Sequence, residues 1–223
     1  MLTDRQKQDL IEKHYDINLE YEWWTYTYDI FVEKMAGVGI DVTMKSSVKR
    51  GHPNYPKYDY PEIYFSGFSS QGDGACFAGG ITDWPKFFAA HKEHFDCESM
   101  AYAVVYTECH NVHWYHGSAN YCHENTLNFN VDIAECDYDE DEDDPLTLPQ
   151  AAELALYKAF NYEAFEQAIE DIVKDYCRAL YDDLEKEHDY LTSDEAIWGA
   201  IVASELDKPE EEEETDDATT CNA

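Results

Sequence analysis

Apolar residues recur at helical spacing in the first 35 residues of the chain. Thr3 suits the N-cap position, and the segment after it predicts two helical pieces that divide near residues 15–16. In the second piece, large apolar side chains alternate at steps of four and three: Ile17, Tyr21, Trp24, Tyr28, Phe31 and Met35. This spacing puts them on one helix face, so it predicts core residues rather than a cofactor site. Gly37 and Gly39 are expected to end the helix.

The central part of the chain has the character of β-strands. The segments with this pattern are 40–44, 62–68, 75–81, 101–116 and 121–133. The second and third predict an antiparallel pair across the turn SSQGDG, and the last two predict one long hairpin. A Pro- and Tyr-rich loop is expected at residues 51–61, and a short helix with Pro85 in its first turn at residues 83–95.

The last third of the chain predicts acidic helices. Seven acids in the eight residues 137–144, closed by Pro145, indicate a boundary rather than a regular element. A helical pattern then runs to about residue 187, with one apolar stripe: Phe165, Ile169, Ile172, Tyr176, Leu180 and Leu184. Thr192 or Ser193 is expected to cap a further helix that ends near residue 205.

These elements predict an α+β protein, with a small, mostly antiparallel sheet of four or five strands, N-terminal helices and an acidic C-terminal helical layer. Four regions are expected along the chain: an α+β domain at 1–136, an acidic linker at 137–148, an acidic helical region at 149–206 that packs on the domain, and a disordered acidic tail at 207–223.

The charge of the chain is large and uneven. There are 49 acidic and 15 basic residues, a formal net charge of −34, which argues against a protein that binds nucleic acid by neutralising phosphates. Residues 136–223 hold 29 acids and 5 bases, whereas residues 1–50 are almost neutral. Adaptation to high salt would coat every surface with acids, so the unevenness favours a localised role. With 44% apolar and 15% aromatic residues, disorder from end to end is excluded.

The seven cysteines are dispersed without a paired framework, which is typical of a reducing compartment. The first ten residues lack the apolar core of a signal peptide, and no apolar run reaches the roughly 18 residues of a membrane span. We therefore expect a soluble, cytoplasmic protein that makes no contact with a membrane.

Histidines and cysteines gather at residues 109–123: Cys109, His110, His113, His116, Cys122 and His123. A tight hairpin that sets Tyr115 opposite Cys122 and Trp114 opposite His123 would split these side chains between the two sheet faces. A zinc site needs four converging ligands, so the pattern favours ordinary strand residues with no metal and no cofactor. No local signature of a nucleophilic enzyme accompanies the cysteines, and a non-enzymatic protein is expected.

Three stretches of the chain carry a resemblance to a known family. They are EIYFSGFSSQGDGACFAG at residues 62–79, WWTYTYDIFVEKMAGVGIDV at residues 23–42 and LEKEHDYLTSDEAIWGAI at residues 184–201. Together they resemble a bacteriophage and prophage family whose members often carry the label antitoxin of a toxin–antitoxin stability system. The resemblance implies a phage-encoded protein, found in the cytoplasm of the host cell, and it supplies no catalytic residues.

The acidic helices and the run before them are the predicted binding site. The residues expected to contact a partner are Asp139, Glu140, Asp141, Glu142, Asp143, Asp144, Glu163, Glu166, Glu170, Asp171, Asp175, Asp182, Asp183 and Glu185. An acid at every second or third position of a helix approaches the linear charge of duplex DNA, about one per 1.7 Å. The carboxylates are therefore expected to stand in for phosphates.

The predicted function is a non-enzymatic, phage-type inhibitor that mimics nucleic acid. Its expected partner is a basic nucleic-acid-binding protein or a defence complex of the host, with no direct contact to nucleic acid. Two alternatives stay open. One is an antitoxin-like protein that neutralises a single toxin, and the other is a zinc-binding or cysteine enzyme.

Overall fold

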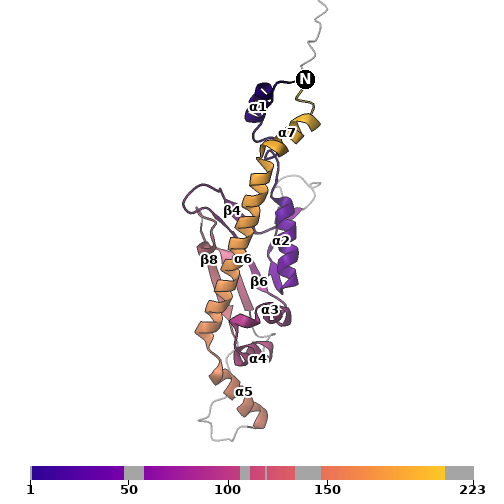
Figure 1. The fold of residues 1–223 in the computed structure, drawn as a ribbon. Helices are drawn as coiled ribbons and strands as arrows, with labels where there is room; N and C mark the ends of the chain where they lie inside the picture. The colour runs from indigo at the N-terminus through magenta and orange to yellow at the C-terminus, as the bar shows by residue number, and fades with distance from the viewer. Residues whose placement is uncertain (1, 48–57, 106–110, 119, 134–146, 209–223) are drawn as a thin grey trace, which may run out of the picture. The chain divides into compact units, whose positions relative to one another are not determined.

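The computed structural model describes residues 2–47, 58–105, 111–118, 120–133 and 147–208 (Figure 1). The helices are α1 (Asp4–Lys13), α2 (Thr25–Gly37), α3 (Trp84–Ala90), α4 (Cys97–Val105), α5 (Leu148–Ala159), α6 (Tyr162–Leu191) and α7 (Asp194–Ala203), with short 3-10 turns η1 (Lys92–His94) and η2 (Glu124–Thr126). The strands are β1 (Ile40–Val42), β2 (Met44–Ser47), β3 (Tyr58–Pro61), β4 (Ile63–Ser66), β5 (Gly74–Phe77), β6 (Gly79–Ile81), β7 (Asn111–His116) and β8 (Leu127–Asp132). The fold is α+β, as predicted.

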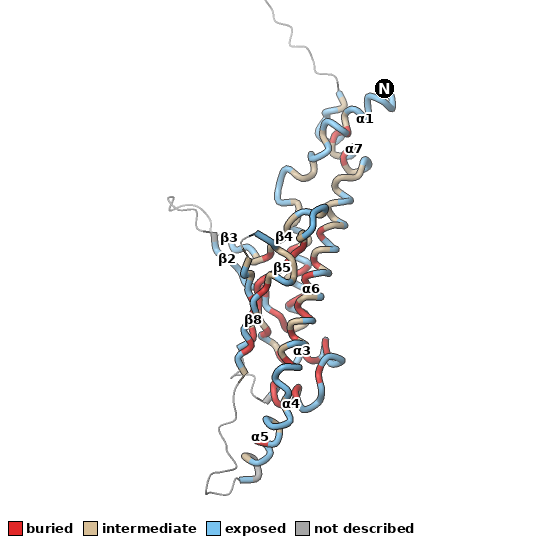
Figure 2. Tube along the Cα trace, turned by 90° about the vertical axis from the view of Figure 1, so that its left-hand side faces the viewer, coloured by how far each residue is buried: buried red, intermediate tan, exposed pale blue. Residues whose placement is uncertain are grey.

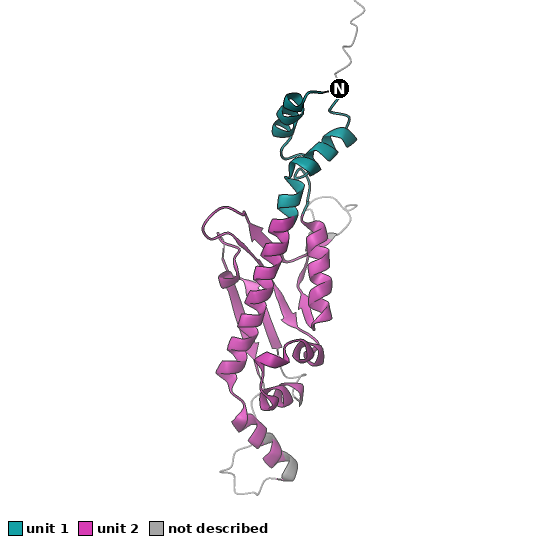
Figure 3. Cartoon of the chain, in the orientation of Figure 1, with its two compact units in different colours: residues 1–23, 187–223 teal, residues 24–186 magenta. Residues whose placement is uncertain are grey.

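The chain forms two compact units (Figure 3). Unit 1 consists of residues 1–23 and 187–223, and unit 2 of residues 24–186. Residues 149–186 belong to the same unit as the strands, and the first and last described helices belong to one unit. The four predicted regions stay a prediction. The predicted linker lies largely outside the described residues, as does almost all of the predicted tail.

Three bent segments of unit 2, residues 40–47, 58–66 and 74–81, interlock by strand pairing. Each segment pairs antiparallel with both of the others, because β1 pairs with β6, β2 with β3, and β4 with β5. The bends lie at Thr43, Glu62 and Ala78, where backbone hydrogen bonds close a ring. The N–H of Thr43 donates to the carbonyl of Ala78 (2.9 Å), that of Ala78 to Glu62 (2.9 Å), and that of Glu62 to Thr43 (2.7 Å). We call this arrangement the three-way junction.

The sheet extends from the three-way junction through β6 to β7 and β8, all antiparallel, in the order β1-β6-β7-β8. The predicted hairpin is right in its pairing and wrong in its register. Trp114 lies opposite Phe129 rather than His123, and Tyr115 lies opposite Asn128 rather than Cys122. The reason is a ten-residue connection at 117–126 that contains η2 and closes with the N–H of Gly117 donating to the carbonyl of Thr126 (2.9 Å).

The predicted strand at 101–116 is also too long, because its first part belongs to helix α4. The buried residues of α4 are Ser99, Tyr102 and Ala103, which share one helix face. The ring of Tyr102 stacks on that of Phe160 with centroids 4.9 Å apart. This packing against the connection from α5 to α6 stabilises helix over strand.

The N-terminal helices follow their sequence signals in part. Thr3 and Gln6 form the capping box of α1, and α2 ends at Gly37, two residues before Gly39, which has φ +81°. Helix α2 begins only at Thr25, so Ile17 and Tyr21, which the predicted stripe includes, lie before the helix; Tyr21 is 85% exposed. In α3, Asp83 accepts a hydrogen bond from the N–H of Lys86 at the N-cap, and proline lies in the first turn as predicted.

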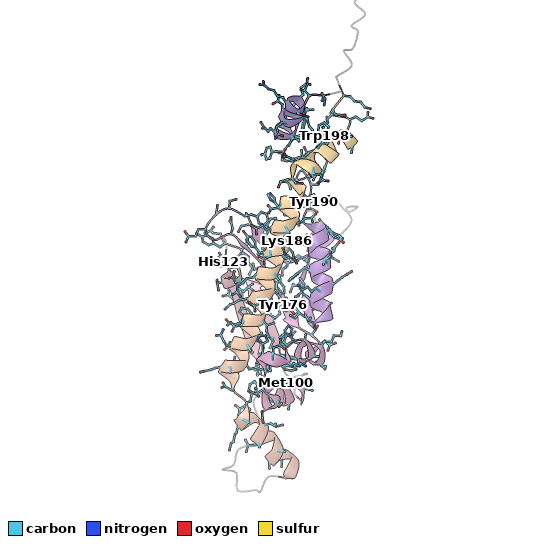
Figure 4. The ribbon with its side chains drawn as sticks, viewed as in Figure 1. Met100, His123, Tyr176, Lys186, Tyr190 and Trp198 are labelled. Atoms are coloured by element: carbon cyan, nitrogen blue, oxygen red, sulfur yellow. The ribbon has the colours of Figure 1, made fainter. Side chains whose placement is uncertain are left out.

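Unit 1 has a small helical core. Its buried side chains are Ile11 from α1 and Ile197 and Ile201 from α7. Lys7 lies over the ring of Trp198, 4.7 Å from its centroid (Figure 4). The amide of Asn18 donates to the carbonyl of Leu191 (2.8 Å), which fixes the segment after α1 to the end of α6. Among the described residues of the whole chain, no helix has both the length and the apolar character needed to cross a membrane.

Phe77 connects the layers of unit 2. It is fully buried, and its ring lies edge-on to Phe31 of α2 (5.0 Å between centroids) and to Trp114 of β7 (5.5 Å). Because it precedes the bend at Ala78, its side chain packs directly beside the three-way junction. One residue thus joins a covering helix, the junction and the long sheet.

Replacing Phe77 with alanine should lower the free energy of unfolding by about 3–5 kcal/mol, because the cavity opens at the centre of unit 2. The matched control is Tyr115→Ala, on a strand of the same sheet but 51% exposed, which should cost less than about 1 kcal/mol. Urea unfolding followed by far-ultraviolet circular dichroism measures both. Equal losses would contradict the central role of Phe77.

Candidate protein-binding face

Helix α6 presents one buried and one exposed face. The buried side chains are Phe165, Ile169, Ile172, Val173, Cys177, Leu180 and Leu184. In Figure 2 these positions turn toward the strands, and the exposed positions of α6 turn away from them. The predicted stripe is confirmed except at Tyr176, which is only half-buried and uses its hydroxyl as a hydrogen-bonding group.

Polar contacts hold α6 on unit 2 along its length. The hydroxyl of Tyr162 donates to the carbonyl of Val131 on β8 (2.9 Å). About five turns toward the C-terminus, the hydroxyl of Tyr181 donates to the carbonyl of Gly67 in the turn between β4 and β5 (3.1 Å). These two hydrogen bonds fix the rotation of α6 about its own axis, so its outward side chains have defined positions.

A buried histidine adds a third attachment. His91, which follows α3, donates from Nδ1 to the carbonyl of Phe87 (2.8 Å), so its Nε2 accepts from the hydroxyl of Tyr176 (2.8 Å). Burial lowers the pKa of His91, because the charged ring would lose its hydration. Sequence reasoning missed this pair, since nothing in the spacing of the two residues indicates contact.

All eight predicted contact residues on α6 lie outside its buried set. Five are exposed, namely Glu163, Asp171, Asp175, Asp182 and Asp183, and three are half-buried, namely Glu166, Glu170 and Glu185. The six predicted contacts at 139–144 lie outside the described residues. Along the helix, Asp171, Asp175, Asp182 and Glu185 share an outward stripe with Arg178, at steps of four and three residues. We call this stripe the acidic face.

Three cations on α6 offset part of its charge. Lys174 pairs with Glu170 (2.8 Å), Lys186 with Asp183 (3.3 Å), and Arg178 with Asp175. These pairs have the i,i+3 or i,i+4 spacing of helical ion pairs, so the sequence carried a signal for them. Arg178 also contacts Glu124 of η2 (3.4 Å), a pair that no sequence spacing indicates.

The resulting charge density on α6 is lower than that of duplex DNA. Residues 163–186 hold eight acids and three bases. At 1.5 Å rise per residue this gives roughly one net charge per 7 Å, against one per 1.7 Å of duplex. Taken alone, α6 therefore has a lower linear charge density than the nucleic acid. The carboxylates without a cationic partner contribute most to the charge that remains. Among the described residues 163–186, Glu163, Glu166, Asp171, Asp182 and Glu185 have no cationic partner.

The His and Cys side chains near the β7–β8 connection make local contacts. His116 donates from Nε2 to the carbonyl of Tyr121 (2.7 Å), and Nδ1 of His123 accepts from the N–H of Asn125 (3.2 Å). Figure 4 places His123 beside the strands of unit 2. Cys109 and His110 lie outside the described residues. In the part of the chain that the structure describes, no three His, Cys, Asp or Glu side chains are grouped so that they could hold a metal ion.

Burial keeps three thiols protonated. It raises the pKa of Cys76 to about 12, and it raises the pKa of Cys122 and of Cys177 as well. Because the thiolate is the nucleophilic form, these three cysteines are poor nucleophiles at neutral pH.

Comparison with known proteins finds one family. The model of a domain of unknown function, DUF8835, matches residues 23–194. That range contains all of unit 2 and the entire acidic face, and it stops where α7 begins. No curated protein matches the chain, and no solved structure does.

The pair between His91 and Tyr176 makes the stability of unit 2 depend on pH. The folded pKa of His91 is lowered, so the unfolded chain binds the proton first as pH falls below about 6.5, and stability is lost. Between pH 6.5 and 5.5 the loss should reach up to about 1 kcal/mol. His91→Leu should remove this contribution, which the difference between the urea midpoints of the two proteins measures across the pH range. Parallel curves for wild type and variant would contradict it.

Proposed function

We propose that this chain, which belongs to the DUF8835 family, is a non-enzymatic binding protein of phage type that inhibits a nucleic-acid-processing or defence complex of the host. In this proposal the acidic face of α6 occupies a basic groove that otherwise holds nucleic acid. The observation that supports it is the outward stripe of carboxylates on a helix whose opposite face is buried and which is attached to unit 2 at Tyr162 and Tyr181.

The fixed position of α6 favours binding by electrostatics. A rigid helix loses little conformational freedom when it docks, so a larger share of the Coulomb attraction remains as affinity. Asp171 and Asp175 of the acidic face are separated by a rise of about 6 Å, near the axial length of two phosphates on one DNA strand, and Asp182 follows Asp175 after a further rise of about 10 Å. Such a stripe can contact alternate phosphate sites of a cationic groove.

The remaining charge supplies long-range attraction. The segments 134–146 and 209–223 hold eight and seven acids and no base. Their field adds to that of the acidic face and raises the rate of encounter with a cationic surface, an effect that salt weakens. The two segments thus add negative charge to the chain beyond that of α6.

Buried cysteines support a binding role over catalysis. The raised pKa values of Cys76, Cys122 and Cys177 disfavour a thiolate nucleophile at these positions. An antitoxin that covers one basic toxin would use the same acidic face, so the two roles differ in the partner and not in the surface.

Neutralising the four carboxylates of the acidic face tests whether binding depends on that face or only on the net charge of the chain. The variant Asp171→Asn, Asp175→Asn, Asp182→Asn and Glu185→Gln removes the four acids of the acidic face, and it should weaken binding by about 30-fold, at roughly 0.5 kcal/mol for each charge. The matched control is Asp29→Asn, Glu33→Gln, Asp41→Asn and Glu98→Gln, which changes the net charge equally at exposed positions on α2, β1 and α4. It should bind within about threefold of wild type.

The measurement is affinity capture from host lysate at about 50 mM and about 500 mM NaCl, followed by titration of the captured protein. We expect a nucleic-acid-binding partner that is released by salt and displaced by duplex DNA. A single small toxin-like partner would favour the antitoxin role. Equal loss of binding in both variants would mean that only net charge matters, and no loss in either would remove the acidic face from the interface.

A further inference from the structure

Unit 1 has few buried side chains for its size. Its described part comprises 22 residues from each end of the chain, and its buried core consists of Ile11, Ile197 and Ile201. Units of this size seldom gain enough from their own core and are commonly completed by association. The exposed apolar side chains of unit 1 are therefore candidates for contact with another molecule.

One groove of unit 1 runs along α1 and has a volume of about 750 Å³. Helix α1 lines it with side chains of one helix face, namely Gln6, Asp9, Leu10 and Lys13. Leu2 and residues 206–208 complete the lining. The lining positions of α1 span two helical turns, roughly 10 Å, which is the contact length of a short helix.

The apolar surface of the groove is exposed and has a defined position. Leu2 is 39% exposed and Leu206 is 42% exposed, whereas Leu10 also packs against the core of unit 1. Leu206 lies in the turn after α7, where its N–H donates to the carbonyl of Ile201 (3.0 Å) and the preceding Glu205 has φ +60°. This arrangement is that of a Schellman turn, which holds Leu206 against the end of the helix. The three leucines thus offer a fixed contact site for apolar side chains.

Acidic groups surround this apolar surface. Lys208 of the lining pairs with Glu205 (2.5 Å), so its charge is already offset. Asp9 and Asp207, which also line the groove, form no ion pair with any cation of the described residues. Unit 1 as a whole holds 19 acids and 4 bases. The field around the groove therefore attracts cations.

Seven of these acids directly follow the groove. Residues 209–223 contain seven acids and no base, and this segment begins at the residue after Lys208. Its covalent attachment gives the carboxylates a high effective concentration near the groove. An anionic occupant is repelled there, whereas a cationic occupant is attracted.

We propose that the groove along α1 is the docking site for a basic amphipathic helix of a partner protein. The apolar face of that helix lies on Leu2, Leu10 and Leu206, and its Lys and Arg side chains pair with acids of the lining and of residues 209–223. Docking of an amphipathic helix in an apolar groove is a common mode of peptide recognition. This inference goes beyond the proposed function, because it concerns unit 1 and requires apolar contacts in addition to charge.

Three synthetic peptides of about four helical turns test the proposal. The first has leucines on one face and lysines on the other. The second contains the same residues in an order that leaves no apolar face, and the third has glutamate in place of every lysine. Fluorescence anisotropy of each labelled peptide with the full chain, at about 150 mM NaCl, measures the affinity. The first peptide should bind at least about tenfold more tightly than either of the others.

The variant Leu206→Ala tests the apolar contact. It should weaken binding of the first peptide about tenfold, because an anchoring side chain of the groove is lost. Its matched control is Val202→Ala, which is similarly exposed but lies outside the groove lining and should bind within about twofold of wild type. Circular dichroism checks the helices of both variants. If Leu206→Ala loses helicity, Leu2→Ser at the other side of the groove should give the same loss of binding.

A second pair of variants tests the charge of the occupant. Replacing the seven acids of residues 209–223 with their amides should weaken binding of the first peptide at least about fivefold. The matched control replaces the seven acids of residues 137–144, which changes the net charge equally and should leave binding within about twofold. The variant that neutralises the acidic face should also bind this peptide within about twofold, which separates the groove from the site of the proposed function.

Five results would overturn the proposal. Equal affinity of the first and second peptides would mean that only charge matters, and equal affinity of the first and third would mean that the occupant is not basic. Binding that both leucine variants leave unchanged would place the helix elsewhere. Tighter binding after the acids of residues 209–223 are neutralised would assign the groove to that segment. In sedimentation velocity without peptide, a dimer that Leu206→Ala dissociates would assign the groove to a second copy of the chain.

Discussion

The ring of backbone hydrogen bonds among Thr43, Glu62 and Ala78 is the constraint on which unit 2 depends. Each of the three segments pairs over one half of its length with one neighbour and over the other half with the second, so no pair can change its register without breaking the ring. Register is otherwise weakly fixed in strands of three or four residues. The ring fixes the register of these short strands and sets the position of Phe77, against which α2 and β7 pack.

That fixed platform explains how the protein accommodates its charge. Helix α6 holds ten acids, so its stability must come from its buried face and from its attachments to Val131, Gly67 and His91. The three ion pairs on α6 reduce the repulsion between neighbouring carboxylates without neutralising the helix. The excess charge that remains is thus held at known positions, which is what a specific electrostatic interface requires.

Local chemistry was readable from the sequence, and relations between distant segments were not. The N-cap at Thr3, the stop at Gly37 and the apolar stripe of α6 depend on spacings within one element, and they are confirmed except for Tyr176 in the stripe. The strand predicted at residues 101–105 was wrong, although Ser99, Tyr102 and Ala103 show helical spacing. The predicted register of the hairpin was wrong because the residues at the two ends of a connection do not indicate how many residues the connection contains. The three-way junction, the Glu124–Arg178 pair and the joining of α1 with α7 have no sequence signature, since each arises from packing between segments far apart in the chain.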